Sequence, residues 1–268
     1  MHPIEHLRYV ARAHGADPVD IALGAADALL GVARDPAATL VSARRLVEHH
    51  PLNPALWAMC AQAVTALEPR IEVARVADDV ANDDVASHMM ELLAEVGTVV
   101  TIGWSGHVVD ALVRRGDVHV LVVDSLGDGQ ETFRHLSRRD VSCELVASEG
   151  LATAVTSADA TIVPAVAVGD DAALCTGGAL AMASVAYCTG SRLWTLVSAQ
   201  TRLPRVLFDA MVAGVLDRPD PWASGVDLVP VSMWGTVVAG FGTADAAVSL
   251  SRIDACPPAT EILRRSIV

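Results

Sequence analysis

Lysine is absent from this sequence of 268 residues, so all nineteen basic residues are arginine. Without lysine the chain has no Schiff-base nucleophile and no P-loop lysine. Its 32 acidic residues give a formal net charge of -13, whereas nonspecific nucleic-acid binding rests on a basic surface. We therefore expect no nucleic-acid partner.

Long apolar runs and paired cysteine motifs are also missing. No apolar run approaches the ~20 residues that span a bilayer, and the first residues lack the order of a signal peptide. The five cysteines are widely spaced with no C-x-x-C pair, which is typical of reduced thiols. The adjacent His49 and His50 do not share a helix face, so they are poor joint metal ligands. These absences predict a soluble, cytoplasmic protein with no membrane partner, no metal site and no cofactor.

Short runs of apolar and β-branched residues, each followed by a polar turn and a helical pattern, dominate the middle of the chain. They are residues 99–102, 119–123, 141–146, 160–163 and 193–197, with candidate edge strands at 226–231 and 235–239. Strands that are apolar throughout are buried on both faces, which indicates a parallel sheet covered by helices. The expected helices lie near residues 106–115, 130–138, 150–156, 177–189 and 203–216, with a short terminal helix from 257 onward.

The first part of the chain has no convincing strand pattern. Alanine-rich segments with helical spacing cover residues 18–34, 36–49, 54–67 and 71–95. Asp35-Pro36 and Asn53-Pro54 are typical helix starts, in which a capping side chain precedes proline at the first helical position. We predict an α/β protein with an N-terminal helical bundle (1–95) followed by a Rossmann-like parallel sheet with helices on both faces (96–268).

The turns that follow the strands form the candidate site, because ligands of parallel sheets bind outside the carboxyl ends of the strands. Backbone N–H groups at a helix start favour an anion such as phosphate. The candidate ligand-binding residues share a position at a helix start after a strand: Gly103, Ser105, Gly106 and His107, and Thr176, Gly177 and Gly178. They predict contacts to a phosphate or a sugar, and ordinary turn residues are the alternative.

Two further features after strands have simpler explanations. Gly127-x-Gly129 is a weak dinucleotide signal without its third glycine, so a tight turn is favoured. Cys175 lies near Asp170 and Asp171 in the sequence, and carboxylates raise the pKa of a thiol. We therefore expect neither NAD binding nor a catalytic thiolate.

Six segments carry a resemblance to a known family. One is residues 199–204, which fall where the family has a loop after a strand. The other five are residues 50–58 at a helix start, 101–109 and 120–125 at strand ends, 158–168, and 174–179. They look like the family's Arg-Pro-Thr-Ala-x-Asn-Leu helix start, its first strand and turn, its strand ending in Glu-Ser-Arg-Pro, its Val-Asp-x-Val-x-Val-Gly-Ala-Asp-x-Ile segment and its Asn-Lys-Ile-Gly-Thr turn. The family contains the alpha, beta and delta regulatory subunits of translation initiation factor 2B, methylthioribose-1-phosphate isomerase and ribose-1,5-bisphosphate isomerase.

This resemblance implies a phosphorylated sugar or nucleotide as ligand and a homodimer that pairs through the α/β part. A phosphate-contacting arginine of the family falls at His50, which adds His50 to the ligand-binding candidates. The cysteine and aspartate proposed to move the proton in the isomerases fall at Gly103 or Trp104 and at Val166. Because losing an acid or a base removes about 10²–10⁴-fold for each transfer, the isomerase activity is not carried over.

The sequence leaves open hypotheses of different classes. The first is a diverged, non-catalytic subunit-like protein that binds a small phosphorylated ligand or acts as a regulatory subunit. The alternative is a sugar-phosphate isomerase with relocated groups, in which His107 pairs with Asp124 or Asp170 across one pocket. A purely structural interaction protein is the third. Trp222 and Trp234 fit either a dimer interface or the core.

Overall fold

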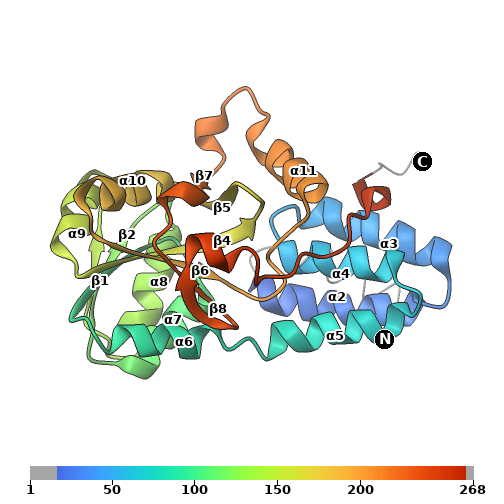
Figure 1. Ribbon diagram of the computed structural model, residues 1–268, viewed down its shortest axis with the longest axis horizontal. Helices are drawn as coiled ribbons and strands as arrows, with labels where there is room; N and C mark the ends of the chain where they lie inside the picture. The colour runs from blue at the N-terminus through green and yellow to red at the C-terminus, as the bar shows by residue number, and fades with distance from the viewer. Residues whose placement is uncertain (1–16, 264–268) are drawn as a thin grey trace. The chain divides into compact units, whose positions relative to one another are not determined.

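The computed structural model describes residues 17–263, which divide into two compact units (Figure 1). Unit 1 combines the chain up to Asp83 with Ala199–Asp217 and the segment from Asp254 onward. Unit 2 combines Asp84–Ser198 with Arg218–Ile253. The chain therefore contributes to each unit from segments that are far apart in the sequence. None of the helices within residues 17–263 is long and apolar enough to cross a membrane.

Unit 1 is helical, and its helices begin where the sequence places capping residues and prolines. Its elements are α2 (Pro18–Val32), α3 (Pro36–His49), α4 (Pro54–Thr65), α5 (Pro69–Ala81), α11 (Arg205–Leu216) and a 3-10 turn, η4 (Thr260–Leu263). Asp35 caps α3 by accepting the N–H groups of Ala37 and Ala38 (3.0 and 3.1 Å), and Asn53 caps α4 in the same way. Each of these helices has proline in its first turn, where the missing N–H removes no helical bond. Of the expected terminal helix, the described residues form only η4.

The single long helix expected over residues 71–95 is wrong, because the chain breaks it into α5 and α6 (Val85–Leu93). Asn82 ends α5, and its side-chain amide donates to the carbonyl and the carboxylate of Asp78 (3.1 and 2.8 Å). Asp83 accepts the N–H of Ala199 at 2.6 Å, so it belongs to a long-range contact within unit 1. The acidic residues of this segment therefore include a helix boundary that side-chain hydrogen bonds hold in place.

Unit 2 contains the predicted parallel sheet. Its strands are β1 (Thr98–Ile102), β2 (His119–Val123), β3 (Cys143–Val146), β4 (Ala160–Val168), β6 (Arg192–Val197), β8 (Thr236–Ala239) and β9 (Gly242–Asp245). They lie in the order β3-β2-β1-β4-β6-β8-β9, and every neighbouring pair is parallel except β8 and β9. The strand order changes direction between β1 and β4, where ligands of such sheets commonly bind.

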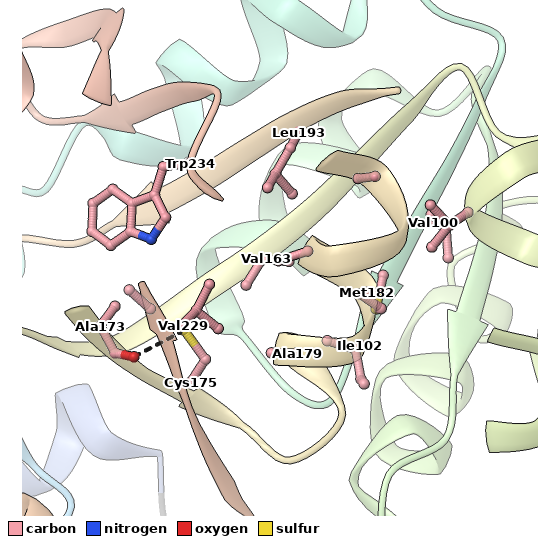
Figure 2. Close-up of a cluster of buried hydrophobic side chains, with 14 of the residues drawn as sticks. Val100, Ile102, Val163, Ala173, Cys175, Ala179, Met182, Leu193, Val229 and Trp234 are labelled. Atoms are coloured by element: carbon pink, nitrogen blue, oxygen red, sulfur yellow. Dashed lines mark hydrogen bonds between the residues drawn. The ribbon is translucent and has the colours of Figure 1, made fainter. Parts of the chain in front are cut away.

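Helices cover both faces of this sheet, as predicted. On one face α6, α7 (Gly106–Arg115) and α8 (Asp128–Ser137) pack on residues such as Val99 and Ile162. On the other, α9 (Leu151–Ser157) and α10 (Ala179–Thr189) pack on Val100 and Leu193. Figure 2 shows this second cluster, in which Ala179 and Met182 of α10 lie near strand residues. The strands therefore bury side chains in both directions, as their unbroken apolar runs require.

An antiparallel extension of the sheet was predicted only in part, because residues 226–231 were a candidate edge strand but residues 172–176 were not expected as a strand. β4 continues past Pro164 to Val168, turns, and returns as β5 (Ala172–Thr176), which pairs with β7 (Val226–Pro230). The apolar run at 160–163 predicted a shorter strand, and the hairpin that β4 forms with β5 was not expected. Proline cannot donate a hydrogen bond in a ladder, and the pairing of β4 with β1 stops at Ile162, two residues before Pro164. The rest of β4 pairs with β6 up to Pro164 and then with β5.

Candidate functional site

A pocket of about 280 Å³ lies within unit 2 at the carboxyl ends of β1 and β2. It is lined by the ends of these strands, the turn after β2, the residues around the start of α9, the start of α10 and the segment before β7. Asp124, Gly177 and Gly178 are sequence-predicted candidates that line it. The pocket therefore lies at the edge of the sheet where the candidate residues were predicted, and only some of these residues line it.

The turn between β2 and α8 is closed by the carboxylate of Asp124. Asp124 Oδ1 accepts the N–H groups of Gly127 and Gly129 (3.1 and 3.2 Å), and Oδ2 accepts from Gln130 Nε2 at 3.1 Å. Gly129 has no room for a side chain, since a Cβ there would lie 2.6 Å from the carbonyl oxygen of Val123. The two glycines thus form a tight turn around a carboxylate of the chain itself.

The start of α10 is closed by a second carboxylate, from β7. Asp227 Oδ2 accepts the N–H groups of Gly178 (2.7 Å) and Leu180 (3.1 Å). Gly178 has a φ of +91°, in the left-handed region, and a Cβ there would lie 2.7 Å from Ile102 Cδ1. The helix start that was predicted to bind phosphate therefore already holds an anionic group.

The remaining polar groups of Gly177 are also used within unit 2. Its N–H donates to the carbonyl of Gly225 at 2.7 Å, and its carbonyl accepts the hydroxyl proton of Ser125. These bonds join the turn after β2 to the start of α10 and to the segment before β7. The pocket is consequently held by hydrogen bonds between segments that are about fifty residues apart in the chain.

The predicted residues after β1 do not line this pocket. Gly103 has a φ of +68°, its carbonyl accepts from Thr132 Oγ1 (2.6 Å), and a Cβ there would lie 2.6 Å from the side chain of Thr176. Ser105 is the N-cap of α7 and accepts the N–H of Val108 at 3.4 Å, and the next helical residues are Gly106 and His107. Gly103 is therefore fixed by close packing and Ser105 by capping, on the helix that covers the opposite sheet face from α10.

Asp170, the proposed alternative partner of His107, lies in the turn between β4 and β5. β5 runs back from this turn to Thr176, and a strand rises ~3.3 Å per residue, so the turn is more than about 10 Å from Thr176. The antiparallel hairpin, which the sequence analysis missed, is the physical reason for this separation. Asp170 is thus not a residue of the strand-end pocket.

His50 belongs to unit 1, where it is buried at the end of α3. Its carbonyl accepts the indole proton of Trp57 (3.2 Å) and the N–H of Asn53 (3.2 Å). These bonds tie the end of α3 to the start of α4. The prediction that His50 contacts a ligand stays a prediction.

Cys175 is buried on β5, and Figure 2 shows its Sγ directed to the carbonyl of Ala173. Burial raises its thiol pKa, and the nearby negative charge of Asp227 raises it further. The thiolate form is therefore strongly disfavoured, which is the behaviour expected of a core cysteine.

The charged side chains that line the pocket are acidic. Asp124 and Asp227 line it, and its lining within the described part of the chain includes no arginine, histidine or cysteine. The pKa of the neighbouring Asp128 is raised, because partial burial disfavours its charged form and Asp124 adds a like charge. Within residues 17–263 there is also no group of three or more His, Cys, Asp or Glu residues that could hold a metal ion.

The lining residues from 221 onward were not predicted as members of the site. Asp227, Trp222 and Gly225 come from β7 and the segment that precedes it. A capping residue is normally recognised from its position one to three residues before the bonded amides, whereas Asp227 is 49 residues from Gly178. Trp222 is 82% exposed and Trp234 only 7%, so Trp234 is a core residue and Trp222 is not.

The arrangement defines a class of protein: a helical unit combined with a Rossmann-like unit that has a strand-end pocket. Translation initiation factor eIF-2B from Pyrococcus horikoshii OT3 shares this fold with a TM-score of 0.72 and 15% identity over 96% of this chain and 97% of that chain. The eIF2B beta subunit from Chaetomium thermophilum gives 0.68 and 16% over 91% and 88%. A chain of the tetrameric eIF2B-beta2-delta2 complex from C. thermophilum gives 0.70 and 16% over 91% of both chains.

These likenesses confirm, at the level of the fold, the resemblance to initiation factor 2B subunits. No protein-family model and no curated protein matches the sequence. Identities of 14–16% mean that the shared fold is preserved by a largely different set of side chains. The chemistry of this chain's pocket must therefore be argued from its own residues.

Proposed function

We propose that this chain is a non-catalytic, subunit-type protein of the initiation factor 2B fold that binds a small ligand in the strand-end pocket. One observation carries this proposal: both carboxylates of the pocket are engaged in holding helix starts. Asp124 accepts three hydrogen bonds and Asp227 two. Groups fixed in this way shape a binding site, whereas proton transfer needs an acid and a base directed at the substrate.

The isomerase alternative receives no support from the placement of its residues. Its acid–base pair requires His107 to meet Asp124 or Asp170 across one pocket. Of these, Asp124 alone lines the strand-end pocket, and both its oxygens accept hydrogen bonds from within the chain. The geometry favours the binding function for this reason.

Phosphorylated sugars and nucleotides are the ligands that the resemblance implies, and the pocket disfavours them. A phosphate at the start of α10 would have to displace Asp227 from the N–H groups of Gly178 and Leu180. It would also lie among carboxylates with no basic side chain in the described lining to balance its charge. We therefore propose a small ligand that is not an anion.

A thermal-shift screen tests this proposal. The panel contains ribose, ribose 5-phosphate, adenosine, adenosine monophosphate and small amines, so that each phosphorylated compound has an uncharged counterpart. A ligand at 100 times its dissociation constant stabilises the fold by about 2.7 kcal/mol. We expect stabilisation by a compound without phosphate, and none by the phosphorylated members.

Variants locate the binding site. Ser148→Phe places a ring at an exposed position of the lining and should abolish the shift. His107→Ala changes a residue outside the lining and should leave it intact. Stabilisation by phosphates alone, lost in His107→Ala but kept in Ser148→Phe, would instead place the ligand at the start of α7.

We also propose that the chain forms a homodimer through its α/β unit. The support is the assembly named for one neighbour in fold, a tetrameric complex of beta and delta subunits. Light scattering coupled to size exclusion should give twice the mass of one chain. A mass of one chain over the whole accessible concentration range would contradict this proposal without affecting the ligand pocket.

A further inference from the structure

The strand-end pocket carries a net negative charge that its own hydrogen bonds do not cancel. A helix start contributes roughly half a positive charge, which offsets only part of the full charge of each carboxylate. Asp227 uses Oδ2 for both of its amide bonds, and the hydrogen bonds among the described residues leave its Oδ1 unused. One carboxylate oxygen in the pocket is therefore able to accept a proton donor from a ligand.

Apolar side chains with high exposure border the same pocket. Trp222 is 82% exposed and Leu126 77% exposed, although both line it. Leu126 has a φ of +54°, in the left-handed region that disfavours a leucine. Its side chain lies over Gly225, since a Cβ added to Gly225 would be 3.4 Å from Leu126 Cδ1. An exposed indole beside carboxylates is the combination that attracts organic cations, which interact with the face of the ring.

We propose that this pocket binds a small organic cation, an ammonium or guanidinium group on a short aliphatic chain. This inference rests on the proposed function, whose ligand it specifies. The charged end would donate to Asp227 Oδ1, and the aliphatic part would lie against Trp222 and Leu126. The volume of about 280 Å³ is below the usual range for drug-sized ligands, about 300–1,000 Å³, which favours a short chain.

Calorimetric titration with three probes of similar length tests this assignment. 1,4-Diaminobutane and agmatine carry the cationic groups, and 1,4-butanediol is the neutral match. We expect both amines to bind with one site per chain and the diol to bind at least tenfold more weakly. The titrations are run at 0.15 M and at 0.5 M salt, because a chain with a net charge of -13 also attracts cations diffusely.

Asp227→Asn is the decisive variant, since asparagine keeps a side-chain oxygen for the amides of α10 but removes the charge. It should weaken diamine binding at least tenfold, and circular dichroism checks that it folds. Trp222→Leu should weaken binding about two- to fivefold, the size of a cation–π contact of about 0.5–1 kcal/mol. Asp171→Asn, an exposed carboxylate in the β4–β5 turn, is the matched control and should leave binding unchanged.

The possible failures are distinct. Equal binding of the diol and the diamine would overturn the cationic ligand and leave the pocket proposal standing. Binding that Asp227→Asn and Asp171→Asn weaken equally would mean diffuse attraction and would overturn the cationic site. Binding of ribose 5-phosphate or adenosine monophosphate in place of the amines, lost in Ser148→Phe, would overturn both the cation and the non-anionic ligand. If no amine, sugar, nucleoside or phosphate binds, the proposed function itself fails.

Discussion

The parallel sheet and the antiparallel extension of unit 2 differ in how directly the sequence indicates them. Residues 119–123 and 193–197 of the sheet are continuous, mostly apolar runs, whereas β5 was expected as part of a loop and pairs with β7, with Thr176 opposite Val226. The sheet supplies the strand ends on which the pocket stands, and β7 and the segment before it supply Asp227 and Trp222. In this molecule the apolar runs of the sequence indicate the sheet, whereas the distinctive side chains of the pocket come from a segment that these runs do not mark as part of the site.

The largest predicted effect is on the free energy of unfolding, and it compares how much the extension and the parallel sheet each stabilise the fold. Ile162 in the sheet and Leu174 in the extension are both fully buried. Substituting either by alanine should lower the free energy of unfolding by about 2–5 kcal/mol, through lost burial and the cavity left behind. Urea denaturation measures both values.

Ile71→Ala, at an exposed position of α5, is the control and should change the free energy by less than about 0.5 kcal/mol. If Leu174→Ala behaves like this control, the extension is a loosely attached part of unit 2. The extension would then differ from the parallel sheet in its contribution to stability, and not only in how directly the sequence indicates it.

The parallel sheet was predictable because each of its main strands is an unbroken apolar run. Residues 119–123 and 193–197 coincide with β2 and β6 to within one residue. The helices α3, α4 and α7 start where their caps and first-turn residues indicate. The break between α5 and α6 was not predictable in the same way, since Asn82 and Asp83 acquire their role through hydrogen bonds that include one to Ala199.

The candidate site was predictable in position but not in chemistry. The rule that ligands bind at strand ends identified Asp124, Gly177 and Gly178. Glycines at a helix start look the same in the sequence whether their N–H groups face a ligand or a carboxylate of the chain. Asp227 decides between these possibilities, and only the pairing of β5 with β7 brings it to Gly178.

A smaller effect is expected from the cap that the extension provides. Asp227→Ala leaves the N–H groups of Gly178 and Leu180 without their acceptor, so unfolding should become easier by about 1–2 kcal/mol. Asp171→Ala, in the exposed β4–β5 turn, removes a carboxylate that caps no helix among residues 17–263 and should stay within about 0.5 kcal/mol of the parent. Thermal and urea unfolding measure both variants. Equal losses in the free energy of unfolding would show that the Asp227 cap does not stabilise the fold, and the extension would then contribute less to the start of α10 than its hydrogen bonds indicate.

The smallest effect concerns carboxylates near the parallel strands, and its sign depends on pH. The pKa of Asp128 is raised by burial and by Asp124, so its charged form destabilises the folded state at neutral pH. Asp128→Asn should therefore raise the midpoint of thermal unfolding at pH 7. This gain should disappear as the pH falls below about 4, where the aspartate of the parent is protonated in both folded and unfolded chains.

Asp159 provides the opposite case at the start of β1. It accepts the N–H groups of Thr98 and Gly97, both at 2.9 Å, and these bonds lower its pKa. A lowered pKa in the folded state gives stability above the unfolded value, lost as the pH falls through the folded one. Asp159→Asn should therefore lower the thermal midpoint at pH 7, with the difference shrinking toward pH 3. If both variants lower the midpoint at pH 7, crowding of carboxylates at Asp128 is not destabilising, and the turn after β2 tolerates more negative charge than its geometry implies.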